Sequence, residues 1–414
     1  MRPSRGAILA GTKGKVGSMS RPASASEPLI YLDGFATTPM APEAKEAMLS
    51  AWSQPGNPGS PHHAGERAAR VVADARAAVA ELIGAAPPEV VFTSGATEAN
   101  NLAIGGVASR AAGRPSDRRR IIVSAVEHKA VLEPAQALAA IGFEVVVAPV
   151  DRCGRLDLQA FAALLDEGTL LVSVQAANNE TGVVQPVREA ASLAHRVGAL
   201  VHCDAAQAAG KIPVDVVELD VDYLSVSAHK LYGPMGVGAL FVSAGAPKPR
   251  ALQRGGGQEQ GLRSGTEPVP LLAGFGAAAR LARQQLGRDA DHCRRLAQRL
   301  RAGLDERQVR LDLTTQETAV VPGALSISLR GVDAEDIVNR LSRAVCLSTG
   351  AACSGGQVSP SHVLKAMGYS EVDARHIIRV FCGRYNTEAE IDRSVALIAS
   401  AARQSALAPG ELHQ

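Results

Sequence analysis

The segment Asp222-Tyr223-Leu224-Ser225-Val226-Ser227-Ala228-His229-Lys230 is a nearly apolar stretch that ends in a lysine. Its β-rich core predicts a buried strand. Similar runs occur before and after it, at residues 90–93, 121–123, 144–148, 170–174, 199–203 and 238–242. Because helical patterns, for example at 64–84 and 97–108, separate these runs, we predict a mostly parallel sheet that is covered by helices on both faces.

The pattern changes beyond Pro270. Residues 271–304 predict one long helix, which would connect the sheet to a second, compact α+β unit. That unit has predicted strands at 324–329 and 344–347, and predicted helices at 334–343, 361–367 and 387–404. We therefore predict a flexible tail at 1–28, a large α/β domain at 29–270, a connector helix and small domain at 271–408, and a tail at 409–414.

Composition excludes several classes of protein. The 414 residues include 43 Lys and Arg against 41 Asp and Glu, which gives a formal net charge of +2. Nucleic-acid binders usually show a basic excess and aromatic stacking side chains, whereas only 3% of this chain is aromatic. No apolar stretch reaches the ~20 residues of a membrane span. The six cysteines are scattered without CxxC pairs, so we predict a reduced, cytoplasmic protein without membrane or nucleic-acid partners and without a resident metal.

Polar residues follow three of the predicted strands, where ligands of parallel sheets bind. Residues 94–100, Ser-Gly-Ala-Thr-Glu-Ala-Asn, open a helix and could seat a phosphate or simply form an N-cap. Asp204 could bind a cationic partner or be an N-cap, and Lys230 could be a reactive amine or a lysine that extends to solvent. Together the three features fit pyridoxal phosphate, with Lys230 bound to its aldehyde, Asp204 at its pyridine nitrogen and the helix at its phosphate.

From Tyr31 to about Ile398 the chain resembles the cysteine desulfurases, the NifS/IscS-like branch of the class V aminotransferase group. The resemblance implies the fold type I of pyridoxal-phosphate enzymes, with a seven-stranded, mostly parallel sheet and a smaller C-terminal α+β domain. It rests on ordered motifs that begin at residues 31, 36, 56, 92, 127, 178, 204, 227, 263 and 351: Tyr-Leu-Asp, Ala-Thr-Thr-Pro, Gly-Asn-Pro, Phe-Thr-Ser-Gly-Ala-Thr-Glu, Glu-His-Lys-Ala-Val, Asn-Asn-Glu-Thr-Gly, Asp-Ala-Ala-Gln, Ser-Ala-His-Lys, Arg-Ser-Gly-Thr and Ala-Ala-Cys-Ser.

The resemblance also implies a role for each matching residue. Lys230 would bind the cofactor covalently, Asp204 would pair with the pyridine nitrogen, and His128 would stack on the ring and transfer protons. The remaining cofactor contacts would be Ala96, Thr97, Asn179, Gln207 at the ring hydroxyl, Ser227, His229 and, from the neighbouring subunit of a homodimer, Thr266. Substrate would be positioned by Asn57, Asn179 and Arg379, whose guanidinium fork suits a carboxylate.

Cys353 is the residue that separates desulfurases from aminotransferases of the same group. It lies in Ser348-Thr349-Gly350-Ala351-Ala352-Cys353-Ser354-Gly355-Gly356, whose small residues predict a mobile, exposed loop. In the family this cysteine attacks the sulfur of cofactor-bound L-cysteine, which leaves alanine and a persulfide. The sulfur then passes to iron–sulfur scaffolds or tRNA-thiolation relays, and the same cysteine is a candidate transient ligand of an iron–sulfur cluster.

Three alternatives remain open at this point. A selenocysteine lyase or an aminotransferase would share the fold, although an aminotransferase would not need Cys353. A non-catalytic scaffold subunit would not need Lys230 or Asp204, both of which are present.

Overall fold

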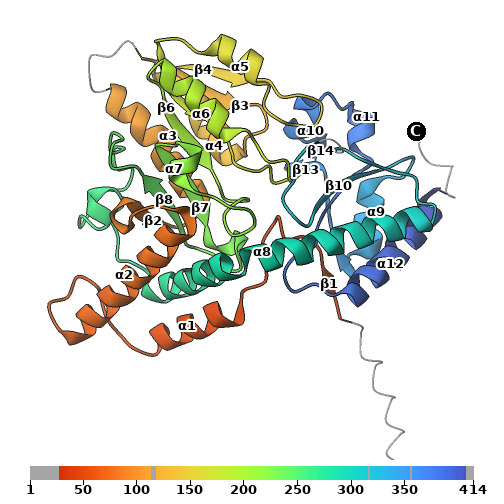
Figure 1. Cartoon of the computed structure of the whole chain (residues 1–414), viewed down its shortest axis with the longest axis horizontal. Coiled ribbons are helices and arrows are strands. Elements are labelled where there is room, and N and C mark those ends of the chain that lie inside the picture. The colour runs from red at the N-terminus through yellow and green to blue at the C-terminus, as the bar shows by residue number, and fades with distance from the viewer. Residues whose placement is uncertain (1–27, 113–117, 316–317, 355–356, 407–414) are drawn as a thin grey trace, which may run out of the picture.

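The computed structural model describes residues 28–112, 118–315, 318–354 and 357–406, and it gives the backbone alone for the parts of 351–360 within these ranges. Two units lie side by side, and helix α8 (Val269–Glu306) runs along both of them (Figure 1). At 38 residues this helix extends the predicted connector by about two residues at each end. Its first half packs in the core of the large unit and its second half in that of the small unit.

The large unit is built on one seven-stranded sheet with the strand order β2-β8-β7-β6-β5-β3-β4. Neighbours from β7 to β4 are parallel, and β8 is antiparallel to both β7 and β2. This confirms the predicted mostly parallel sheet. The strands are β2 Val90–Thr93, β3 Arg120–Ser124, β4 Glu144–Ala148, β5 Thr169–Ser173, β6 Leu200–Asp204, β7 Tyr223–Ser227 and β8 Gly238–Val242.

Helices cover both faces of this sheet because alternate residues of its strands face opposite cores. In β3, Ile122 belongs to the core beneath α2, α6 and α8, whereas Ile121 and Val123 belong to the core beneath α3 and α4. The helices of the unit are α1 Pro42–Trp52, α2 His63–Ile83, α3 Ala96–Ala112, α4 Lys129–Ala137, α5 Leu158–Leu164, α6 Val187–Arg196 and α7 Val216–Leu219.

The C-terminal unit is an antiparallel sheet of order β12-β15-β10-β9 that packs against helices. Its sheet strands are β9 Leu311–Leu313, β10 Ala324–Leu329, β12 Ser348–Thr349 and β15 Ile377–Phe381. Its helices are α9 Ala334–Leu341, α10 His362–Ala366, α11 Glu371–Ala374 and α12 Glu388–Ala406. The α+β character of this unit is the one that the sequence predicts.

The first strand, β1 (Ile30–Tyr31), belongs to the C-terminal unit although it precedes the large unit in the sequence. It pairs in parallel with β11 (Val345–Cys346), and Ile30 and Leu32 are buried in the C-terminal core. The predicted division places this segment within the large domain at 29–270. We propose that division with β1 reassigned to the small domain, because its pairing and its core contacts lie there.

A buried ion pair ties the loop before Thr266 to the sheet. Both guanidinium nitrogens of Arg76 donate to Glu259, whose side chain is 2% exposed and also accepts the N–H of Phe92. We expect Arg76→Ala to lower the free energy of unfolding by about 3 kcal/mol, because it leaves a buried carboxylate without its cation.

Urea unfolding at fixed protein concentration measures this loss. The matched control is Arg301→Ala, which removes an exposed pair with Asp305 at 3.9 Å and is expected to cost less than ~1 kcal/mol. Equal losses in the two variants would contradict the prediction.

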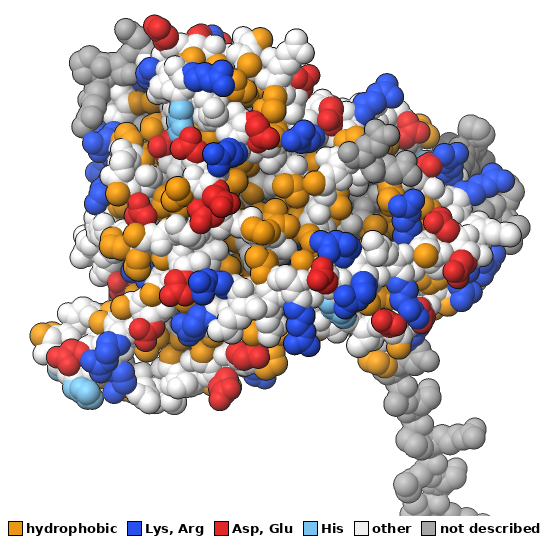
Figure 2. All heavy atoms as spheres, in the orientation of Figure 1, with side chains coloured by type: hydrophobic (Ala, Val, Ile, Leu, Met, Phe, Trp, Pro, Cys, Tyr) orange, Lys and Arg blue, Asp and Glu red, His pale blue; other side chains and the backbone are white. Residues whose placement is uncertain are grey.

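Charged side chains of both signs are interspersed over the face shown in Figure 2, in keeping with the near balance of charge in the sequence. Within the described ranges, no helix combines the length and the apolar character that a membrane crossing requires.

Candidate active site

The carboxyl ends of five strands meet at one edge of the large sheet. Strands β3, β5, β6 and β7 are parallel, and β2 points the same way because both β2 and β7 are antiparallel to β8. Asp204 ends β6, and the segments that follow the other four strands begin α3 or carry His128, Asn179 and Lys230. Residues that are far apart in the sequence are thereby brought together.

These segments line a cavity of about 620 Å³. Most of the predicted site residues are among its lining: Ala96, Thr97, His128, Asn179, Asp204, Gln207, Ser227, His229, Lys230 and Arg379. Three predicted residues are not, and one of them, Cys353, is outside the residues whose side chains the structure describes. Asn57 is exposed and its side chain accepts the N–H of Gly59, and Thr266 is exposed on the loop that Glu259 anchors. Within one chain, neither residue reaches the cavity.

Lys230 ends the turn that follows β7 and points its amine into this cavity. Its Nζ donates to the backbone carbonyls of Phe35 and Ala36, at 2.8 Å in the latter case. Burial, followed by the positive charge of Arg379, lowers the pKa of Lys230 to about 8. A lysine in this state is neutral in a sizeable fraction of molecules near neutral pH, and the neutral form is the nucleophile.

Asp204 is the last residue of β6, and it is 6% exposed. Its Oδ2 accepts the Nδ2 amide of Asn100 at 2.7 Å, and its Oδ1 accepts the N–H of Ala206 at 2.9 Å. Asn100 is fully buried on α3, and sequence reasoning gave it no role. Asn100 lies about one helical turn after Ala96, the first residue of α3, and therefore on the same side of the helix. This spacing was the available signal that Asn100 faces the sheet.

The N-terminus of α3 contributes Ala96 and Thr97 to the lining of the cavity. A helix of 17 residues presents unpaired N–H groups and a positive dipole end there. His229 lies nearby, with its Nδ1 bound to the Thr37 hydroxyl at 3.1 Å. Burial lowers the pKa of His229 to about 4, so its ring is neutral at physiological pH.

His128 caps α4 from the other side of the cavity. Its Nδ1 accepts the N–H of Ala130 at 3.1 Å, so the proton of the neutral ring resides on Nε2. Burial lowers the pKa of His128 below its usual range, which favours this neutral form. The ring therefore presents a proton donor to the cavity.

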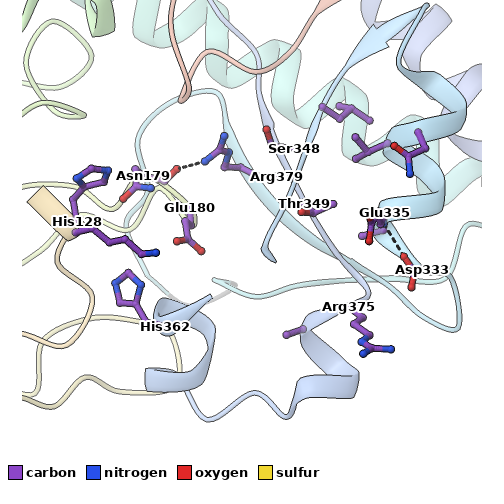
Figure 3. Close-up of a pocket in the computed structure, with 16 residues that line it drawn as sticks. His128, Asn179, Glu180, Asp333, Glu335, Ser348, Thr349, His362, Arg375 and Arg379 are labelled. Carbon is purple, nitrogen blue, oxygen red and sulfur yellow. Dashed lines mark hydrogen bonds between the residues drawn. The ribbon is translucent and has the colours of Figure 1, made fainter. Parts of the chain in front are cut away.

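A second cavity, of about 680 Å³, adjoins the first and shares His128, Asn179 and Arg379 with it. Figure 3 shows it between His128, Glu180 and His362 on one side and Thr349, Glu335 and Asp333 on the other. This cavity lies between the two units.

Arg379 of β15 links the two cavities. Its guanidinium donates to Asp33 Oδ1 at 2.8 Å and to the carbonyl of Asn179 at 3.1 Å, while its buried Nε makes no hydrogen bond to the described residues. Asp33 was quoted in a motif, but its contact with Arg379 was missed because the two residues are remote in the sequence. Arg379 is thus a fixed cation at the junction.

The segment that carries Cys353 begins and ends at the wall of the second cavity. Its backbone forms a hairpin of β13 (Ala351–Ser354) and β14 (Gln357–Pro360), in which Cys353 is opposite Val358. The prediction of a loop is thus corrected to a hairpin, while the side chain of Cys353 lies outside the described part. Ser348 and Thr349 before the hairpin and His362 after it line the cavity.

The model of the aminotransferase class-V family matches residues 30–393. The chain belongs to this family. Among its relatives, a cysteine desulfurase IscS from Anaeromyxobacter sp. (strain Fw109-5) is 45% identical over 384 residues, covering 91% of this chain and 93% of that protein. A cysteine desulfurase from Rattus norvegicus is 42% identical over 370 residues, covering 88% and 81%.

Similar solved structures show the same fold. A NifS-like protein superposes with a TM-score of 0.83 at 38% identity, covering 90% of this chain and 99% of that one. SspA in complex with cysteine superposes with a TM-score of 0.74 at 33% identity, covering 86% and 100%. These likenesses confirm the predicted fold type I.

The cofactor of this family is pyridoxal 5′-phosphate, and the chemistry of the first cavity fits it. A helix N-terminus suits the phosphate, the Asp204 carboxylate suits a protonated pyridine nitrogen, and the amine of Lys230 suits the aldehyde. The buried carboxylate of Asp204 receives two N–H groups, which fix its orientation in the cavity.

Proposed function

We propose that the protein is a pyridoxal-phosphate-dependent cysteine desulfurase, which converts L-cysteine to L-alanine and transfers the sulfur to Cys353. One observation carries this proposal. The cavity lined by Lys230 and Asp204 adjoins a second cavity, and residues on either side of the Cys353 hairpin line the latter. The relatives named cysteine desulfurase and the cysteine-bound SspA support the same substrate.

Arg379 would bind the carboxylate of L-cysteine. It is a cation at the junction of the cavities, its Nε has no hydrogen-bond partner among the described residues, and Asp33 fixes the orientation of its guanidinium plane. Asn179 lies beside it, and we keep the predicted substrate contact for this side chain. Asn57 would have to be supplied by a second subunit.

Two residues of the first cavity, Lys230 and His128, would carry out the proton transfers. Pyridoxal phosphate, when bound, supplies an electron sink that stabilises negative charge at the substrate Cα. The Nζ of Lys230 accepts the Cα proton, a task for which its lowered pKa fits. The Nε2 of His128 holds a proton that can be delivered to the substrate.

Cys353 receives the sulfur in the final step. Its thiolate forms a bond with the substrate sulfur as the C–S bond of the substrate breaks. The carbon then takes up a proton and leaves as alanine, and the sulfur stays on Cys353 as a persulfide.

A product assay tests this proposal against its alternatives. With L-cysteine and a thiol reductant, a desulfurase releases sulfide and alanine in equal amounts. 3-Mercaptopyruvate and the aminated cofactor, without release of sulfide or alanine, would indicate an aminotransferase. Turnover of L-selenocysteine with almost none of L-cysteine would indicate a selenocysteine lyase, and absence of cofactor absorbance would indicate a non-catalytic subunit.

We further propose a cytoplasmic homodimer in which Thr266 of one chain reaches the cofactor phosphate of the other. The exposure of Thr266, away from its own cavity, supports this arrangement. Iron–sulfur scaffolds or sulfur-relay proteins would accept the persulfide sulfur, as the name IscS of several relatives suggests.

The lowered pKa of Lys230 predicts how cofactor loading depends on pH. Only the neutral amine attacks an aldehyde, so the rate of loading of the apoprotein should rise about tenfold per pH unit below pH 8 and level off above it. Stopped-flow absorbance after mixing with pyridoxal phosphate measures this rate. A rate that keeps rising towards pH 10.5, the usual lysine value, would contradict the prediction.

A further inference from the structure

A second lysine lies behind the first cavity and has no place in the reaction described above. Lys211 is only 6% exposed, and it follows β6 in the segment that carries Asp204 and Gln207. Its Nζ donates to Gln207 Oε1 at 3.2 Å and lies 5.7 Å from the ring centre of Phe381. Burial, followed by the charge of Lys230, lowers the pKa of Lys211 to about 7.

Burying this amine is costly. A lysine amine has several N–H donors, and among the described residues Lys211 has one neutral oxygen as its hydrogen-bond acceptor. An apolar side chain of similar length would fill the same space without that cost. The contact with Gln207 therefore indicates a function rather than a contribution to stability.

That contact determines which way the amide of Gln207 points. The ammonium form of Lys211 can only donate, so it must face the oxygen Oε1. On the other side, the carbonyl of Phe35 can only accept, and it receives Nε2 at 2.9 Å. The second hydrogen of Nε2 has no acceptor among the described residues, and Gln207 lines the cofactor cavity.

We propose that Lys211 is a positioning residue that locks the amide of Gln207 with an N–H, and not the oxygen, presented to the ring hydroxyl of the cofactor. This proposal rests on the proposed function and on the predicted contact of Gln207 with that hydroxyl. An N–H donor stabilises the deprotonated ring oxygen, whereas a flipped amide would offer an acceptor and stabilise the protonated form. Lys211 thus sets the ionisation of the cofactor without touching it.

The test is Lys211→Met in the cofactor-loaded protein, with visible absorbance titrated against pH. The spectroscopic pKa of the bound cofactor is expected to rise by about one unit, the size of one hydrogen bond to a charged group. The thermal midpoint of unfolding is expected to stay the same or increase, because methionine removes a buried amine. The control Lys45→Met removes an exposed lysine of α1 and is expected to change neither quantity.

A double-variant cycle shows whether Lys211 acts through Gln207. In a Gln207→Leu background, Lys211→Met should cause no further shift of the spectroscopic pKa. An equal shift in both backgrounds would overturn the proposal, as would an unchanged titration together with a lower thermal midpoint in Lys211→Met. These outcomes require a wild type that shows the cofactor band and releases sulfide and alanine. A wild type without them would instead overturn the proposed function.

Discussion

Lys230→Ala is expected to reduce the desulfuration of L-cysteine by a factor of about 10³ or more, because it removes both the anchor of the cofactor and the acceptor of the Cα proton. The amine occupies the cavity at the end of β7, where Phe35 and Ala36 orient it through their carbonyls. No other lysine lines this cavity in the described part of the chain, so nothing there can replace it.

The measurement is alanine release at saturating L-cysteine, together with the visible spectrum of the purified variant. Lys230→Arg is the matched variant, since it keeps the positive charge but cannot form the bond to the aldehyde. Both variants should lose the band of lysine-bound cofactor. Activity within tenfold of the wild type in either variant would remove Lys230 from the site.

Asp204→Ala is expected to reduce turnover by a factor of about 10³, because the carboxylate stabilises the positive charge on the pyridine nitrogen throughout the reaction. The variant also leaves the buried amide of Asn100 without its acceptor, because this amide donates to Asp204 at 2.7 Å. Some loss of stability will therefore accompany the loss of activity.

Asp204→Asn separates these two effects. Asparagine retains an acceptor for Asn100 but carries no charge, so stability should be largely restored while turnover stays low. Turnover and thermal midpoint are measured on the same preparations. Full activity in Asp204→Asn would show that the charge is unimportant and would contradict the assignment.

The sequence predicted the residues at strand ends because position along a parallel strand determines which edge a side chain reaches. Strands β2, β4, β8 and β10 begin and end at the predicted residues. The run predicted at 199–203 is shifted by one residue in β6, so that Asp204 ends this strand, and Lys230 ends the turn that follows β7. In α2 the prediction was less accurate. The spacing of apolar residues in the 64–84 pattern places Val71 on one helical face with Ala75, Val79, Leu82 and Ile83. Val71 is instead half-exposed and Val72 is buried, since packing against α8 sets the rotation of the helix.

Contacts between distant segments could not be predicted in this way. The support of Asp204 by Asn100, of Arg379 by Asp33 and of Gln207 by Lys211 depends on how helices and units pack, which no local pattern encodes. The same holds for β1, a strand of two residues whose partner β11 lies near the other end of the chain. Such short strands carry almost no signal of their own.

Mass spectrometry of the wild type and of Cys353→Ala after a single turnover with L-cysteine, without reductant, tests the central claim most directly. The account predicts one added sulfur atom on the peptide that contains Cys353 in the wild type. It also predicts that Cys353→Ala keeps the cofactor band and its response to L-cysteine but forms almost no alanine. Equal alanine from both proteins, or sulfur on another cysteine, would contradict the account.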